Sequence, residues 1–216
     1  MSLTQAETVF GSVHEQGLND LLRAFFTARP RHLNYGTPFF VPVTTAAATS
    51  ITPPVIPGVG SPQFAILFTI PTVDIHPDSS GGASALIPGP GQFVVQTTVT
   101  LALLCGGIPT TTGTAPIPGE LLQAQLTVFA LCHPVVVNSA PGTGQIGVAV
   151  DQVEIVDIQP GGLESILECL ILMVLQGALG AMRLPFNTIT AGAFGLILLA
   201  GPLAEEDQVK VRGNAL

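Results

Sequence analysis

Three titratable side chains occupy alternate positions in Asp74-Ile75-His76-Pro77-Asp78. In an extended strand these positions share one face, because successive side chains point to opposite sides. One His with two carboxylates is a ligand set that a divalent metal accepts. The competing interpretation, a strand that ends in a turn at Pro77-Asp78, is the one we favour. We therefore expect no metal, no cofactor and no catalytic residue here.

A second polar group follows a predicted helix and consists of Arg29, Arg31, His32 and Tyr35. These side chains are able to bind an anion or to anchor the loop after the helix, and we favour the anchor. The serines lie outside any GxSxG context, and the glycine-rich stretches lack the GxGxxG and Walker spacings that hold phosphates. The sequence therefore predicts a protein that is not an enzyme.

The composition excludes several classes of function. Charged residues make up 9% of the 216 positions and hydrophobic residues 47%, a composition too apolar for a disordered chain. The net charge is −8 with six Lys and Arg in total, which argues against binding to nucleic acid. The proportion of apolar residues is higher than usual. The fold must bury their side chains, or a partner must cover them.

The N-terminal sequence and the spacing of the cysteines indicate in which cellular compartment the protein is expected. Met1–Glu7 is polar and has no secretory signal, so a cytoplasmic location is expected. Cys105, Cys132 and Cys169 are far apart in apolar runs and are expected to be small buried side chains, not a disulfide framework.

Two helices are predicted, one near each end of the chain. Thr4–Glu7 has capping-box spacing, and apolar residues at helical spacing follow as far as Arg29-Pro30, which predicts an amphipathic helix. Leu163–Met182 is apolar on every face after its first turn, so we expect a helix surrounded by other elements. Its uninterrupted part, Cys169–Met182, is shorter than the roughly 20 residues that span a bilayer, so no transmembrane segment is expected.

Strands are predicted between the helices and after the second one. The proline-rich section from 36 to 62 is interpreted as an extended connection with one strand at Phe39–Thr45, and Pro202–Asp207 as a charged turn. Glycine- and proline-rich linkers favour an antiparallel meander, and helices that do not alternate with strands favour an α+β fold. The predicted strands are Gln63–His76, Gln92–Cys105, Glu120–Val137, Gly144–Ile158, Phe186–Leu199 and Gln208–Arg212.

The C-terminal third resembles the tubular lipid-binding (TULIP) superfamily, in its branch similar to the bactericidal/permeability-increasing protein and in its bacterial OrfX-like branch. The resemblance is carried by Leu170–Arg183 (LILMVLQGALGAMR), Leu184–Asn187 (LPFN) and Gly192–Leu196 (GAFGL). It implies a single domain over residues 1–216. In that domain a long curved antiparallel sheet wraps around the long apolar C-terminal helix and an amphipathic helix stands at the N-terminus.

The resemblance also implies a function. It predicts a non-catalytic protein that holds a lipid, or another elongated apolar ligand with an acyl chain, in an apolar tube between sheet and helix. By alternation, the residues expected to line the tube are Phe64, Ile66, Phe68, Leu101, Leu103, Leu126, Val128, Leu170, Val174 and Leu175. The alternative is a structural or assembly protein that pairs with itself, as a homodimer, or with a related TULIP partner through apolar surfaces.

Overall fold

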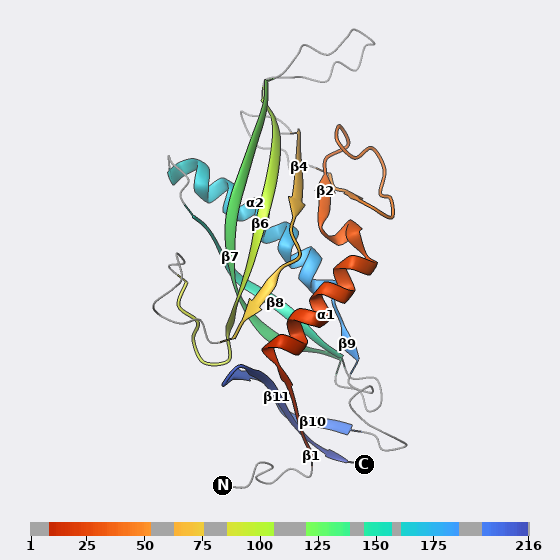
Figure 1. The fold of residues 1–216 in the computed structure, drawn as a ribbon, viewed down its shortest axis with the longest axis vertical. Helices are drawn as coiled ribbons and strands as arrows, with labels where there is room; N and C mark the ends of the chain where they lie inside the picture. Colours follow the sequence, from red (N-terminus) through yellow and green to blue (C-terminus); the bar gives the residue numbers. More distant parts are fainter. Residues whose placement is uncertain are drawn as a thin grey trace. The chain divides into compact units, whose positions relative to one another are not determined.

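The computed structural model of the chain describes residues 9–52, 63–75, 86–105, 120–138, 145–156, 161–185 and 196–215. Within these ranges it has eleven β-strands and two α-helices (Figure 1). They group into two compact units. The first unit contains the chain to Phe25, Pro71–Gln96 and Val128 onward, and the second contains Phe26–Ile70 and Thr97–Thr127. The single domain expected over residues 1–216 stays a prediction.

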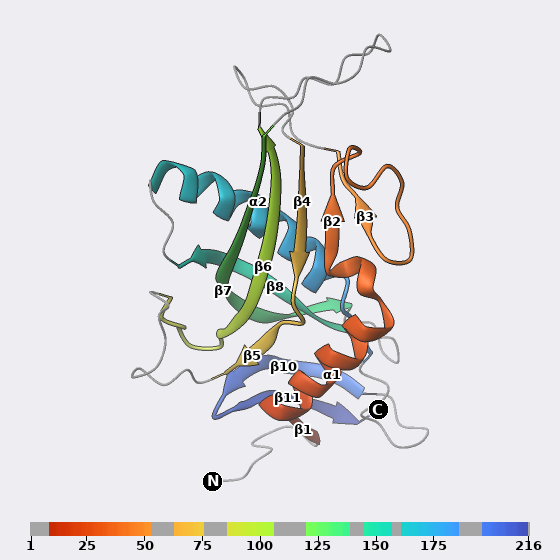
Figure 2. The same cartoon turned by 45° about the horizontal axis from the view of Figure 1, so that its top comes forward.

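A three-stranded antiparallel sheet in the first unit joins the two ends of the chain. It consists of β1 (Val9–His14), β10 (Leu196–Glu205) and β11 (Gln208–Ala215), in the order β1-β11-β10 (Figure 2). Glu206 and Asp207 connect β10 to β11 with φ of 51° and 59°, the left-handed pair that a type I′ hairpin requires. The charged turn predicted at Pro202–Asp207 is therefore confined to these two residues.

The predicted N-terminal helix is half right. Helix α1 runs from Glu15 to Ala28, but the preceding residues form β1 and pair with β11 along its whole length. Gly11, Ser12 and Val13 are weak helix formers, and the pairing with β11 decides their conformation. The apolar stripe is confirmed, because Leu18 and Leu22 are buried one turn apart.

The longest strands are β6 (Phe93–Cys105) and β7 (Glu120–Asn138), which neighbour each other and pass from one unit to the other. In the first unit β5 (Thr72–Asp74) pairs with the start of β6. On the other side β7 pairs with β8 (Gln145–Ile155), and β8 pairs with β9 (Leu184–Pro185). These pairs are antiparallel, as the meander predicted.

The expected fold class, a sheet wrapped around a long apolar C-terminal helix, is wrong. Strands dominate the described residues, and α2 (Gly161–Gly180) lies along β8 with one face covered. A helix is present close to the predicted boundaries of 163 and 182. Its buried residues follow a helical stripe: Leu167, Ile171, Val174, Leu175, Ala178 and Leu179. Its other face, with Cys169, Met173, Gln176 and Gly177, is exposed, so apolar residues all round a helix did not require it to be surrounded.

The second unit begins with the end of α1 and the short 3₁₀ helix η1 (Pro30–His32). Its strands are β2 (Asn34–Gly36), β3 (Thr49–Ser50) and β4 (Gln63–Phe68), and β4 pairs with β6 from Val99 to Leu104. The β2–β3 pair is parallel, so the sheet is mixed.

Two strand predictions in this region need correction. The strand expected at Phe39–Thr45 does not form, and turns occupy that stretch. The strand expected at Gln63–His76 is divided into β4 and β5 around Pro71, which has no N–H to donate to a ladder.

The cysteine and membrane predictions have separate outcomes. Cys132 is fully buried, as expected, whereas Cys169 is exposed on α2, which corrects its prediction; the Cys105 side chain lies outside the described residues. Among the described residues, no helix has the length and apolar character needed to cross a membrane.

Candidate apolar binding site

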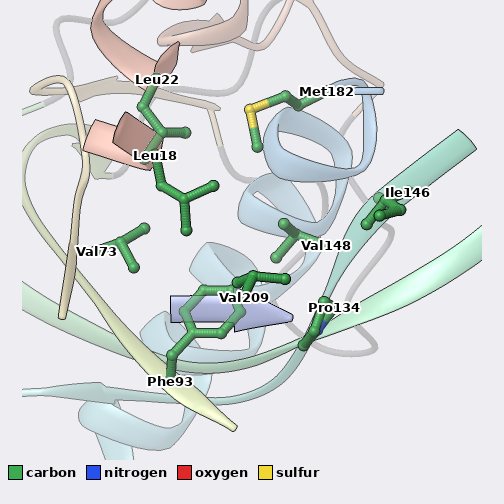
Figure 3. Close-up of a pocket in the computed structure, with 10 residues that line it drawn as sticks. Leu18, Leu22, Val73, Phe93, Pro134, Ile146, Val148, Met182 and Val209 are labelled. Carbon is green, nitrogen blue, oxygen red and sulfur yellow. The ribbon is translucent and has the colours of Figure 1, made fainter. Parts of the chain in front are cut away.

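The first unit contains a partly open apolar pocket with a cavity of about 40 Å³ (Figure 3). Its lining residues come from seven parts of the chain, and none of them has a polar side chain. They are Leu18, Leu22, Val73, Phe93, Pro134, Ile146, Gly147, Val148, Met182 and Val209.

The spacing of the lining residues follows from the elements that hold them. Leu18 and Leu22 are four residues apart on α1 and therefore lie on one helix face. Pro134 of β7 pairs with Val148 of β8, so these two side chains stand on the same face of the sheet. Met182 follows α2, and its flexible thioether side chain suits an irregular wall.

The cavity is too small for a long ligand in its present form. About 40 Å³ has room for roughly three water-sized groups, and a water molecule finds no hydrogen-bond partner among these apolar side chains. The cavity therefore accommodates a few methylene groups, and a longer chain requires one wall to move.

Two polar side chains of α1 hold β5 beside the pocket. The Asn19 amide donates from Nδ2 to the Val73 carbonyl at 3.0 Å, and its Oδ1 accepts the Val73 N–H at 2.7 Å. Glu15 accepts the Ile75 N–H on Oε2 at 2.9 Å. These bonds satisfy backbone groups of β5 and of Ile75, directly after it, with side chains of α1. They place Val73 against Leu18 and Leu22 in the pocket wall.

One cation lies near the pocket. The Arg183 guanidinium donates to the Met182 carbonyl at 3.2 Å. A Cβ atom on Gly147 would lie 2.8 Å from Nη1 of Arg183, so glycine permits this close approach. Within the described ranges, no carboxylate forms an ion pair with Arg183.

The residues expected to line a tube do not line this pocket. Phe64, Ile66, Phe68 and Leu101 are buried in the core of the second unit. Leu126, Val128, Val174 and Leu175 are also buried, whereas Leu103 and Leu170 are partly exposed. Alternation correctly identified buried positions, but it carried no information on where packing leaves a void.

The residues that line this pocket were not singled out from the sequence, for identifiable reasons. Leu18 and Leu22 belonged to the apolar stripe of the predicted N-terminal helix, and Ile146 and Val148 to the predicted strand Gly144–Ile158. Phe93 was placed by alternation on a face of the predicted strand Gln92–Cys105. Val209 stands near a strand start and Met182 at a helix end, where periodicity ceases to be informative. Their convergence is a product of tertiary structure.

The candidate metal ligands are not brought together in the described structure. Asp74 is exposed on β5, and His76 and Asp78 lie outside the described residues. Among the residues that the structure describes, no group of three or more His, Cys, Asp or Glu side chains has a metal-binding arrangement.

The polar group after α1 anchors its loop through the backbone. The Thr49 hydroxyl donates to the Arg31 carbonyl at 2.9 Å, and the His32 N–H donates to the Arg29 carbonyl at 3.1 Å. Burial, Arg31 and Arg29 lower the pKa of His32. Burial raises the pKa of Tyr35 to about 12, with Arg31 opposing the shift. These bonds use backbone groups, so the choice between a side-chain anchor and an anion site stays a prediction.

A polar cluster that sequence reasoning missed joins β7, β8 and the start of β6. Asp151 Oδ2 lies 2.8 Å from His133 Nδ1 and accepts the Gln92 amide at 2.8 Å. These residues are 59 positions apart at the extremes, so spacing gave no signal for them. The cluster is partly exposed and ties neighbouring segments together.

Comparison with known proteins shows a distant likeness of fold. No protein-family model matches the chain, and no curated protein matches it. Among solved structures, the chain is similar to a crystal structure of lipopolysaccharide binding protein, with 14% sequence identity and a TM-score of 0.39. The match covers 97% of this chain and 50% of that one, so the chain spans about half the length of that protein. A likeness of this strength bears on neither family nor function, and the TULIP resemblance stays a prediction.

Proposed function

We propose that the protein binds an elongated apolar ligand, such as a lipid with an acyl chain, in the pocket of the first unit, and that it does so without catalysis. The observation that carries the proposal is a cavity lined by ten residues with no polar side chain. Ligand sites are mostly apolar concave surfaces with few polar groups, and burial of a methylene group contributes about 0.8 kcal/mol.

The first test asks whether the protein carries such a ligand. The purified chain is extracted with organic solvent and the extract is analysed by mass spectrometry, while native mass spectrometry measures the intact protein. Near-stoichiometric acyl lipid supports the proposal. A chain that is empty, and stays empty after incubation with mixed lipids, contradicts it.

The second test locates the binding site with a defined probe. Calorimetry measures binding of dodecanoic acid and of dodecan-1-ol to the wild type and to Val148→Phe, whose ring occupies the cavity. We expect the variant to lose at least tenfold in affinity, a difference of about 1.4 kcal/mol. The matched control is Val43→Phe at an exposed position of the second unit, and its affinity should equal that of the wild type. Equal affinities in all three proteins would place the ligand elsewhere.

A second candidate function is assembly, and the exposed face of α2 favours it. Met173 is 49% exposed, and Cys169, Gln176 and Gly177 continue the same uncharged face. Apolar surface of this kind is a common feature of protein interfaces. Light scattering coupled to size-exclusion chromatography tests this function. An oligomer that Met173→Lys dissociates supports assembly, and a monomeric wild type contradicts it.

A further inference from the structure

The pocket is smaller than the ligand proposed for it. The inference drawn from this difference rests on the function proposed above. A cavity of about 40 Å³ holds a few methylene groups, so a longer alkyl chain enters only if a wall is displaced. The walls are built in different ways, and the difference indicates which one moves.

Most walls belong to strands held by backbone ladders. Pro134, Ile146 and Val148 lie in the β7–β8 pair, which extends over ten paired positions, and Val209 lies in β11 between two strands. The wall formed by α1 and β5 has less backbone pairing, because β5 pairs with β6 over three positions only. Strand β5 has three residues, and side chains of α1 bond to this segment, Asn19 to Val73 and Glu15 to Ile75.

We propose that Asn19 and Glu15 form a latch that holds α1 on β5 in the ligand-free protein and that opens when an alkyl chain enters the pocket. Neither residue lines the pocket, so both act as positioning residues. The ligand-bound state lacks the latch bonds, and the free energy needed to break them weakens binding in the wild type. A protein without the latch has already lost these bonds, so a ligand binds it more tightly.

The latch therefore predicts opposite effects of one substitution on stability and on affinity. Asn19→Ala removes two hydrogen bonds to Val73 and should lower the melting temperature of the ligand-free protein. The same change should lower the Kd for dodecanoic acid by about tenfold, mainly through faster association. A residue with a merely structural role would not tighten binding when it is removed.

The experiment compares calorimetric Kd and stopped-flow association rates for the wild type, Asn19→Ala and Gln16→Ala. Gln16 is the control, because it is exposed on the same helix and bonds to Asp20 within that helix. Its Kd and association rate should equal those of the wild type. Glu15→Ala removes the bond to Ile75 at the other end of the latch, and it should tighten binding by a smaller factor. This variant keeps the test decisive if Asn19→Ala does not fold.

The outcomes separate the latch from the proposed function. Tighter and faster binding in Asn19→Ala or Glu15→Ala supports the latch. Wild-type binding with unchanged or weaker affinity in both variants overturns the latch and leaves the proposed function intact. No binding of dodecanoic acid by any of the proteins overturns the proposed function, and the latch with it.

Discussion

The two units contain apolar interiors of the same chemical kind that are built from different numbers of elements. In the second unit, Phe64, Ile66 and Val99 are no more than 1% exposed, and β4 pairs with β6 through them. In the first unit, residues of equal size around Val148 leave a cavity of about 40 Å³. The difference lies in the number of separate elements that must converge. In the second unit one strand pair carries the buried residues by simple alternation, whereas in the first unit seven segments converge on the cavity.

The largest effect is expected in the core of the second unit. Ile66 is fully buried and faces Leu101 across the β4–β6 pair, so Ile66→Ala should destabilise the protein by about 2–5 kcal/mol. Chemical denaturation measures the change. Binding of dodecanoic acid to the folded variant should be unchanged, because Ile66 does not line the pocket. Loss of binding by a folded Ile66→Ala protein would contradict the separation of the two interiors.

Tyr35 provides a spectroscopic measure of the same core. It is the chain's one tyrosine, it is 6% exposed, and its ring meets Phe68 edge to face at 6.2 Å. Burial raises its pKa to about 12, above the ordinary value of 10. The folded state therefore holds the phenolic proton more tightly than the unfolded state does. The stability that this provides is complete below pH 10 and is lost as the pH rises toward 12.

Absorbance of the phenolate at 295 nm follows this titration without interference, since the chain has no tryptophan. A midpoint near 12 that falls to about 10 in denaturant is the expected result. A midpoint near 10 in the folded protein would show that the interior around Phe68 admits water.

Local pattern predicted more of the second interior than of the first. Alternation in Gln63–Phe68 correctly placed Phe64, Ile66 and Phe68 on one buried face, because a strand in a sheet has a period of two. The pocket could not be predicted in this way. It depends on Leu18 and Val209, which are nearly two hundred positions apart, and on Asn19 bonding to a strand 54 positions later.

The predicted environments of two segments were wrong because they were inferred from apolar composition and local pattern alone. Leu163–Met182 is apolar on every face, but β8 covers one side of α2 and leaves Met173 exposed. Val9–His14 continues the apolar pattern of α1 but pairs with β11, a partner at the other end of the chain. In both segments the local pattern was compatible with more than one environment, and distant strands decided between them.

The smallest expected effect is a change in stability that has opposite signs in the two interiors. Val148→Ile adds one methylene group at the cavity and keeps the β-branched side chain that suits a strand, so it should stabilise the protein by up to about 1 kcal/mol. Val99→Ile adds the same group in the second unit, where Val99 is 0% exposed and faces Phe68. There the added atom displaces packed neighbours, and we expect destabilisation of about 1–3 kcal/mol.

Thermal and chemical denaturation of both variants measures the change in the free energy of unfolding that the same Val-to-Ile substitution causes at each position. Opposite signs mean that the void near Val148 exists in solution and is available to a ligand. Equal destabilisation would mean that the first unit is packed as tightly as the second, and it would remove the physical basis of a ligand site there. Because one methylene group is all that differs, backbone propensity and side-chain branching are held constant, and the sign depends on the space around the side chain.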